Sequence, residues 1–212
     1  MRIAVIGATG RTGQQVVRHA LERGAEVTAV VRNPQKLSPE WSSHSRFRAA
    51  VADARDVEAL TRALKHQDGV ALCLGAAAGE GHAVHREGVD ACLTAMATAG
   101  VSRIVALSAS GMVVSGDDPL SRYLAKPLVA RLLADHFADL SAMEDRLAAS
   151  DARWTLIRPP RLTQRQGNGH YRSRRDGNVR WGFTITRDDL ALAIVDALYD
   201  DSTIGRHLSV AA

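Results

Sequence analysis

Short apolar runs alternate along most of the chain with longer stretches in which apolar residues recur at helical spacing. The runs predict strands near residues 2–6, 26–31, 47–51, 70–74, 104–107 and 154–157. The stretches between them predict helices near residues 11–23, 56–65 and 85–99, and a last helical pattern that continues to about residue 149. This alternation is typical of βαβ units. We therefore predict an α/β fold, a Rossmann-like doubly wound parallel sheet with helices on both faces.

The alternation ends near residue 160. Residues 161–182 contain glycines, arginines and turn signals, among which Asp176-Gly177 predicts a hairpin. A helix then runs from Asp188-Asp189 to about Tyr199, and residues 207–210 form a last short strand. The length of 212 residues suits one domain. We expect residues 1–212 to form a single Rossmann-like domain in which residues 161–182 fold over the strand ends as a small substrate lobe.

The segment that joins the first strand to the first helix is rich in glycine. It reads Gly7-Ala8-Thr9-Gly10-Arg11-Thr12-Gly13, a variant spacing of the dinucleotide-binding fingerprint. Gly7 allows a tight turn, Gly10 lets backbone N–H groups approach a pyrophosphate, and Gly13 lets the helix pack close to the sheet. The helix N-terminus adds N–H donors for an anion. The segment therefore predicts dinucleotide binding, and the alternative is a turn that serves strand-to-helix geometry alone.

The residue after the second strand distinguishes the two nicotinamide dinucleotides. Sites that prefer NAD place Asp or Glu there to accept a hydrogen bond from the ribose 2′-hydroxyl, whereas this chain has Arg32, followed by Lys36. A guanidinium pairs with a 2′-phosphate and stacks on adenine. Arg11 in the glycine turn adds a third positive group. This pattern favours NADP(H), and the alternative is a solvated surface arginine.

Composition and charge narrow the class of protein. Charged residues make up 24% of the chain and aromatic residues 4%, which indicates a soluble protein with an aliphatic core. The first apolar run is too short for a membrane span or a signal peptide, so we expect a cytoplasmic protein without a membrane partner. Cys73 and Cys92 lie in apolar segments without metal-like spacing, and we expect reduced, buried thiols and no metal site.

The net charge of +4 alone does not predict nucleic-acid binding. The basic residues are spread along the chain, except for Arg172, Arg174 and Arg175. That cluster lacks interleaved aromatic residues beyond Tyr171, so we interpret it as a solvated hairpin or a substrate rim. We expect a small-molecule acceptor as the partner, and a monomer or small homo-oligomer.

These motifs together resemble the atypical short-chain dehydrogenase/reductase families. Within that group the chain is similar to the biliverdin reductase B (flavin reductase) and NmrA-like NAD(P)H-binding branch over nearly its full length. The residues that support the resemblance are the glycine turn, Val31-Arg32, Asp53, Leu74-Gly75, Ala99-Gly100-Val101, Leu107-Ser108, 155–159 and 185–191.

The resemblance implies a set of cofactor contacts. Thr9, Gly10, Arg11, Thr12 and Gly13 would hold the pyrophosphate, together with the Gly7 turn. The other implied contacts are Arg32 and Lys36 at the 2′-phosphate, Asp53 and Ala54 at the adenine, Leu74 and Gly75 at the ribose, and Ser108 to Ser110, Arg161 and Leu162 at the nicotinamide.

The proton donor of the superfamily is a tyrosine in a Y-x-x-x-K pattern. Tyr123 and Lys126 are one residue short of that spacing, and Pro127 indicates that Tyr123 precedes the helix. In the biliverdin reductase B pattern a serine follows the fifth strand, which points to Ser108 and Ser110 on either side of Ala109 as catalytic candidates.

Other ionisable residues are weaker candidates. A histidine of the biliverdin reductase B pattern is replaced by Arg161. His136 and His170 are other ionisable groups that could reach the site, although helical histidines are more often structural. We interpret Glu144 as part of a structural pair or cap, and Asp188-Asp189 as a helix N-cap and first-turn acid.

Three functions fit these features. The first is an NADPH-dependent oxidoreductase that transfers hydride to a flat conjugated acceptor such as a flavin, quinone or tetrapyrrole, because stacking then reduces the need for an acid. The second is a non-catalytic NADP(H)-binding redox sensor of the NmrA-like type. The third, an epimerase or dehydratase acting on a nucleotide sugar, normally needs the tyrosine–lysine pair and a larger C-terminal domain.

Overall fold

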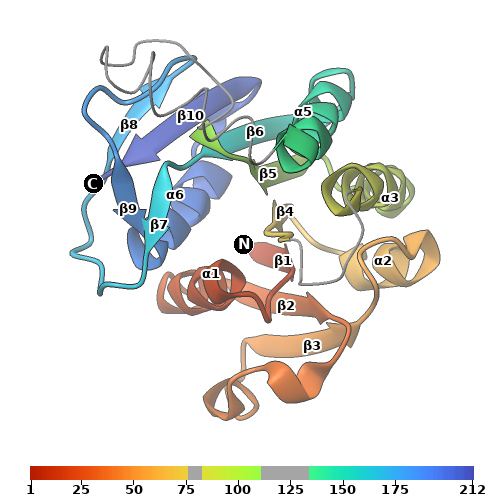
Figure 1. Ribbon diagram of the computed structural model, residues 1–212. Coiled ribbons are helices and arrows are strands. Elements are labelled where there is room, and N and C mark those ends of the chain that lie inside the picture. Colours follow the sequence, from red (N-terminus) through yellow and green to blue (C-terminus); the bar gives the residue numbers. More distant parts are fainter. Residues whose placement is uncertain (76–82, 111–133) are drawn as a thin grey trace.

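The computed structural model describes residues 1–75, 83–110 and 134–212. Eight strands in these ranges form one sheet in the order β3-β2-β1-β4-β5-β6-β10-β8 (Figure 1). They are β1 (Arg2–Ile6), β2 (Glu26–Val31), β3 (Phe47–Val51), β4 (Gly69–Leu72), β5 (Arg103–Leu107), β6 (Arg153–Arg158), β8 (Arg172–Arg175) and β10 (Arg206–Ala211). Neighbours from β3 to β10 pair in parallel, and only β8 is antiparallel to its partner among these strands. The strand order reverses direction between β1 and β4, which confirms the predicted doubly wound α/β fold.

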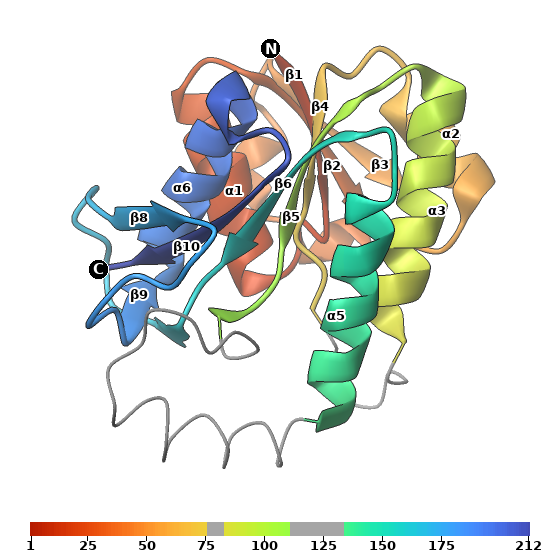
Figure 2. The same ribbon diagram turned by 90° about the horizontal axis from the view of Figure 1, so that it is seen from above.

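Helices cover both faces of the sheet, as Figure 2 shows with the sheet seen edge-on. α1 (Arg11–Glu22) and α6 (Arg187–Tyr199) pack together on one face, and α2 (Val57–Leu64), α3 (Val84–Ala99) and α5 (Ala134–Ala148) lie on the other. The central strands are buried on both faces, so they are continuously apolar rather than alternating. None of the helices in the described ranges has the length and apolarity of a membrane span.

The helix ends follow local side-chain chemistry. Asp56 caps α2 by accepting a hydrogen bond from the backbone N–H of Ala59 at 3.0 Å. Gly100 ends α3 in the left-handed conformation, with a φ of 73°. At α6 the predicted cap is two residues too late, while the predicted first-turn acid is confirmed. Thr186 is the N-cap, because its hydroxyl accepts from the N–H of Asp189, and both aspartates lie inside the first turn.

The C-terminal part departs from the predicted hairpin. Strand β8 pairs with β10, and β9 (Thr184–Thr186) pairs in parallel with β7 (Arg161–Thr163) in a second sheet. The turn at Asp176 is therefore not a hairpin turn. It is fixed to β10, since the Asp176 N–H donates to the His207 carbonyl at 2.8 Å. Strand β10, rather than a hairpin partner, forms the backbone hydrogen bonds with β8.

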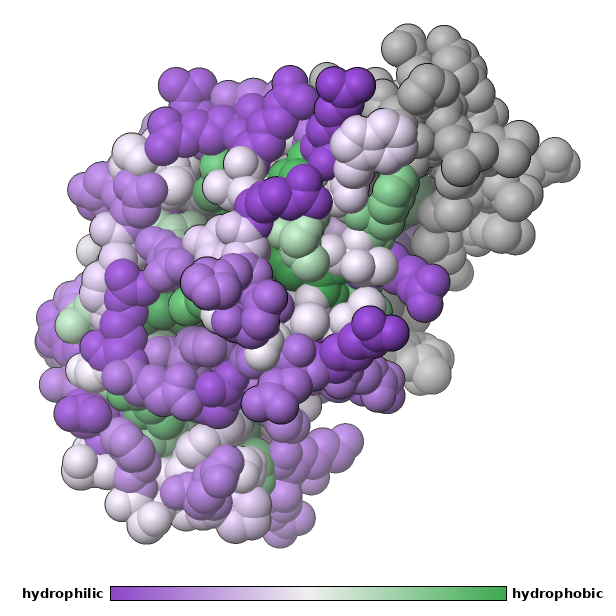
Figure 3. All heavy atoms as spheres, turned by 90° about the vertical axis from the view of Figure 1, so that its left-hand side faces the viewer, coloured by the Kyte–Doolittle hydropathy of each residue, from purple (hydrophilic) through white to green (hydrophobic). Residues whose placement is uncertain are grey.

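Strand β8 forms an exposed basic edge of the main sheet. All four of its residues are exposed, and three of them are arginines. Figure 3 shows this side of the molecule as largely hydrophilic, with small separate apolar areas. Charged side chains on an edge strand oppose pairing with another chain.

Candidate functional site

A cavity of about 730 Å³ lies at the carboxyl ends of the parallel strands, within the size range of cofactor sites. On its glycine-turn side, next to β1, β2 and β3, the lining residues are Gly7, Thr9, Gly10, Arg11, Thr12, Arg32, Lys36, Asp53 and Ala54. On its histidine side, next to β5 and β6, they are Leu107, Ser108, Ala109, Pro159, Pro160 and Leu162, with His85 from α3 and His136 and Leu140 from α5. Leu74 and Gly75, after β4, lie between the two sides.

The glycine turn packs tightly against neighbouring backbone atoms. Gly7 has a φ of 82°, and a Cβ there would lie 2.5 Å from the carbonyl oxygen of Cys73. A Cβ on Gly13 would lie 2.2 Å from the carbonyl oxygen of Gly7. Among the described residues, a Cβ on Gly10 would meet only the Gly7 carbonyl, at 3.2 Å, which leaves space above this residue. Two glycines thus bring the N-terminus of α1 against the sheet, and the third leaves its surface clear.

The N-terminus of α1 presents backbone donors to the cavity. Its N-cap, Gly10, makes no side-chain capping hydrogen bond, and the first turn contains no acidic residue. The N–H groups of that turn carry a partial positive charge. A dinucleotide pyrophosphate fits such a donor set, and a side chain at position 10 would obstruct it.

Positive side chains surround the glycine-turn side. Arg11, Arg32 and Lys36 all line the cavity and are exposed. Asp53 is the acid among them: its carboxylate accepts hydrogen bonds from the Arg55 backbone at 2.9 Å and from Arg55 Nε at 3.1 Å. The Arg55 side-chain hydrogen bond is the main cause that lowers the pKa of Asp53, and Arg32 lowers it further. The arginines offset the charge of this carboxylate, so an anion can bind here.

The hydroxyl of Ser108 on the histidine side is already engaged. It donates to Glu144 Oε1 at 2.5 Å, and both residues are buried. Glu144 forms an ion pair with Arg158, in which Arg158 Nε lies 2.9 Å from the same oxygen. This confirms the structural role predicted for Glu144. Since the Ser108 proton is held by a carboxylate, the hydroxyl is available to a ligand as an acceptor.

Two histidines and an aspartate form a second polar cluster on the histidine side. His85 is 3% exposed, and its Nδ1 lies 2.9 Å from Asp139 Oδ2. The same carboxylate accepts hydrogen bonds from the backbone N–H groups of His85 and Arg86, at 2.9 and 3.0 Å. Burial acts to raise the pKa of Asp139, but these hydrogen bonds outweigh it and hold the pKa below its usual value. The ring of His136 meets that of His85 edge-on, with 5.2 Å between centroids.

The remaining walls of the histidine side are mostly apolar. They combine Leu107, Ala109, Leu140, Leu162 and the two prolines after β6. Arg187, the first residue of α6, also lines the cavity, is half-buried, and donates to the Thr163 carbonyl at 3.2 Å. An apolar wall with few polar groups suits a flat organic molecule.

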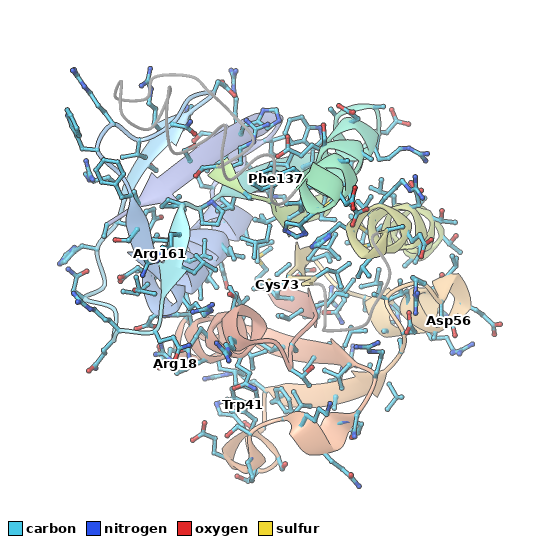
Figure 4. All side chains as sticks on the ribbon, viewed as in Figure 1. Arg18, Trp41, Asp56, Cys73, Phe137 and Arg161 are labelled. Carbon is cyan, nitrogen blue, oxygen red and sulfur yellow. The ribbon has the colours of Figure 1, made fainter. Side chains whose placement is uncertain are left out.

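The structure does not bring every candidate residue to the cavity surface. Gly13 lies beneath the turn, Ser110 donates its N–H to the Pro159 carbonyl, and neither is among the lining residues. Figure 4 places Arg161 on β7, well away from Cys73 at the centre of the view, and Arg161 does not line the cavity. His170 is exposed and also outside the lining. Tyr123 and Lys126 lie outside the described residues.

Both cysteines are buried free thiols. Burial raises the pKa of each to about 12, so neither is a thiolate near neutral pH. Cys73 contributes to the cavity wall at the end of β4. Its part in the site is to shape that wall.

Among the charged and histidine side chains that line the cavity, Arg55, His85 and Arg187 were not predicted from the sequence as site residues. A signal was present for two of them, because His85 and Arg187 each lie in the first turn of a helix. Helices that follow strands of a parallel sheet start on the side of the strand ends where ligands bind. The partner of His85, Asp139, is 54 residues away in the chain, and no local pattern connects them.

A family model described as NAD(P)H-binding matches residues 7–201 of the chain. Protein YwnB of Bacillus subtilis, which is uncharacterised, is 25% identical over 204 residues, which make up 93% of this chain and 92% of YwnB. Protein Rv2047c of Mycobacterium tuberculosis, also uncharacterised, is 36% identical over 105 residues, half of this chain and 12% of that protein.

Solved structures share the fold over the full length of the chain. The oxidoreductase YlbE of Lactococcus lactis has a TM-score of 0.83 at 21% identity, and the match covers 100% of this chain and 90% of YlbE. A short-chain dehydrogenase/reductase of Veillonella parvula in complex with NADP has a TM-score of 0.84 at 16% identity, covering 100% and 94% of the two chains. At these identities the likenesses show a shared fold, and the family model supports the resemblance to NAD(P)H-binding proteins.

Proposed function

Because the chain belongs to the NAD(P)H-binding family, we propose that it is an NADPH-dependent oxidoreductase that reduces a flat conjugated acceptor. One observation above all supports the choice of NADPH. Arg32 directly follows β2, where an NAD site would have an acid, and it lines the cavity together with Lys36 and Arg11. The V. parvula neighbour described above was solved with NADP.

The glycine-turn side would hold the phosphates. The N–H groups at the start of α1 would bind the pyrophosphate, while Arg32 and Lys36 would pair with the 2′-phosphate. Asp53 and Ala54 would flank the adenine, and Leu74 and Gly75 the neighbouring ribose. The cofactor would then extend across β4 to the histidine side, where the reduced nicotinamide supplies the hydride when bound.

The histidine side would receive the acceptor. Its apolar wall, with the two prolines after β6 and Leu162, suits the face of a flavin, quinone or tetrapyrrole. Stacking against such a wall orients the acceptor for hydride transfer. Residues 161–182 would form the small substrate lobe of a single domain that spans residues 1–212.

Arg32→Glu tests the cofactor assignment. Loss of a charge-assisted pair with phosphate costs roughly 1.5–3 kcal/mol, so the dissociation constant for NADPH should rise about 10- to 150-fold. The dissociation constant for NADH should change much less, since it lacks the 2′-phosphate. Fluorescence titration of both cofactors measures the difference.

Arg62→Glu serves as the matched control, because Arg62 is an exposed arginine on α2 outside the cavity lining. It should leave both affinities unchanged. Equal losses of NADPH and NADH affinity in Arg32→Glu would refute the 2′-phosphate role.

NADPH oxidation against a panel of flavins, quinones and carbonyl compounds tests the reductase role. Turnover with at least one conjugated acceptor is expected. Tight NADPH binding without turnover on any of them would favour the non-catalytic redox sensor instead.

A further inference from the structure

The cluster of His85, Asp139 and His136 has no assigned role in the cofactor site described above. Its members come from two helices, since α3 contributes His85 and α5 contributes the other two. Both histidines line the cavity on the side proposed for the acceptor. The cluster therefore places ionisable groups at the point where a reduced acceptor needs a proton.

The hydrogen bond to Asp139 defines the state of the His85 ring. A carboxylate only accepts, so Nδ1 carries the proton that lies between the two residues, and Nε2 is left to gain or lose the second proton. When Nε2 is protonated, the carboxylate compensates the positive charge of the imidazolium. His85 is 3% exposed and lines the cavity, so the small part of the residue that is open faces the space where a molecule would bind.

A purely structural role for Asp139 explains only part of this arrangement. The carboxylate caps α3 through the backbone N–H groups of His85 and Arg86, and this cap joins α3 to α5. Such a cap needs no imidazole. The third hydrogen bond, to the ring itself, fixes the orientation and tautomer of His85, as a carboxylate does for catalytic histidines in other enzymes.

The surroundings of His136 disfavour its protonation. Burial lowers the pKa of His136, and the positive charge of His85 lowers it further. Asp139, the charged group common to both rings, is hydrogen-bonded to His85. The other charged groups that these helices bring to this end of the cavity are Arg86 and Glu87 on α3, Asp135 on α5, and Arg55, which pairs with Glu87. The carboxylate is thus hydrogen-bonded to the ring of His85, and His136 meets that ring edge-on.

We propose that His85 is the proton donor of the reductase, with Asp139 as its positioning residue, and that the physiological acceptor carries a conjugated carbonyl oxygen. This rests on the proposed function. In the reaction, the acceptor carbon gains a hydride from the reduced nicotinamide, which is oxidised. The C=O π bond breaks, and the oxygen takes the proton from Nε2 of His85. The imidazole is left neutral, still bonded to Asp139, and regains a proton from water.

His85→Asn gives the sharpest test, because the Asn amide can still donate to Asp139 but has no group that titrates. With NADPH and a quinone or enone acceptor, kcat should fall about 10²- to 10⁴-fold, the range for a general acid. The dissociation constant for NADPH should stay within a factor of two. In the wild type, kcat should decrease as the pH rises and the donor loses its proton, and this limb should disappear in His85→Asn.

Two further variants separate the roles. His136→Phe keeps a ring against His85 and should lower kcat less than tenfold. His170→Asn changes an exposed histidine outside the cavity and should have no effect. A free flavin serves as the comparison acceptor, and His85→Asn should retain most of its flavin turnover, because stacking rather than an acid governs that reaction.

A second readout does not depend on turnover. Nitrogen-15 NMR of the cofactor-free protein should show the neutral His85 ring with its proton on Nδ1, and Asp139→Asn should shift the ring toward the Nε2–H tautomer. A wild-type ring already in the Nε2–H form would overturn the proposal.

The kinetic outcomes distinguish a failure of the donor role of His85 from a failure of the proposed reductase function. If His85→Asn reduces the carbonyl acceptor at a rate within threefold of wild type, or loses flavin and carbonyl turnover equally, His85 is not the donor. A wild type that binds NADPH but reduces only flavins also overturns the donor role. A wild type that reduces neither acceptor overturns the proposed function with it.

Discussion

The two sides of the cavity are built in different ways. The glycine-turn side comes from the first βαβ unit, where Gly7, Gly10 and Arg32 lie within about two dozen residues of one another in the chain. Its polar groups are backbone N–H groups and exposed cations, which need little support. The histidine side is assembled from β5, β6, α3 and α5, and its polar groups are buried pairs such as Ser108 with Glu144 and His85 with Asp139. Binding thus relies on local backbone geometry, whereas the proposed chemistry relies on long-range packing.

This difference predicts that removing a charged side chain lowers the free energy of unfolding more on the histidine side than at an exposed site. Arg158→Met would leave Glu144 buried without its ion-pair partner, at a cost of about 3–5 kcal/mol in the free energy of unfolding. The two side chains are 13% and 11% exposed, so water can compensate little. Chemical denaturation measures the change.

The matched control is Arg146→Met on α5, which breaks an exposed ion pair with Asp90 at 2.9 Å. That loss should be at most about 1 kcal/mol. Similar losses for the two variants would mean that the buried pair is no more important than a surface one, and the contrast between the two sides would fail.

The glycine-turn side should respond to added volume rather than to lost charge. Gly13→Ala places a Cβ against the Gly7 carbonyl, and overpacking of this kind costs about 1–3 kcal/mol. The clash is with backbone, so α1 must move away from the strand ends, and NADPH affinity should fall as well. Thermal denaturation and cofactor titration of the same samples report both effects.

Gly75→Ala is the control for this substitution in the stability measurement. No atom of the residues that the structure describes lies within 4 Å of a Cβ at Gly75, and its φ requires no glycine, so the free energy of unfolding should hardly change. If Gly13→Ala is as stable as Gly75→Ala, the close packing of α1 against the turn is not needed.

The two sides of the cavity also differ in how much of their structure the sequence predicts. The doubly wound sheet, and the position of the glycine turn and Arg32 at the strand ends, follow from patterns that are local in the chain. The prediction of a hairpin at Asp176 is wrong, because β8 pairs with β10, which is distant in the chain. No local pattern marks His85, since its partner Asp139 lies on another helix. The hydrogen bond of Ser108 to Glu144, 36 residues away, has no local sequence signal either. Side chains that act through a partner on another element leave no periodic signal.

A crystal structure of the protein in complex with NADP⁺ tests most directly the central claim, that the cavity binds NADP(H) with its 2′-phosphate at Arg32. The 2′-phosphate should lie within about 3.2 Å of the Arg32 guanidinium, the pyrophosphate on the N-terminus of α1, and the nicotinamide ring beside Ser108 and His85. A dinucleotide bound in the reverse direction, or with its 2′-phosphate away from Arg32, would contradict the account.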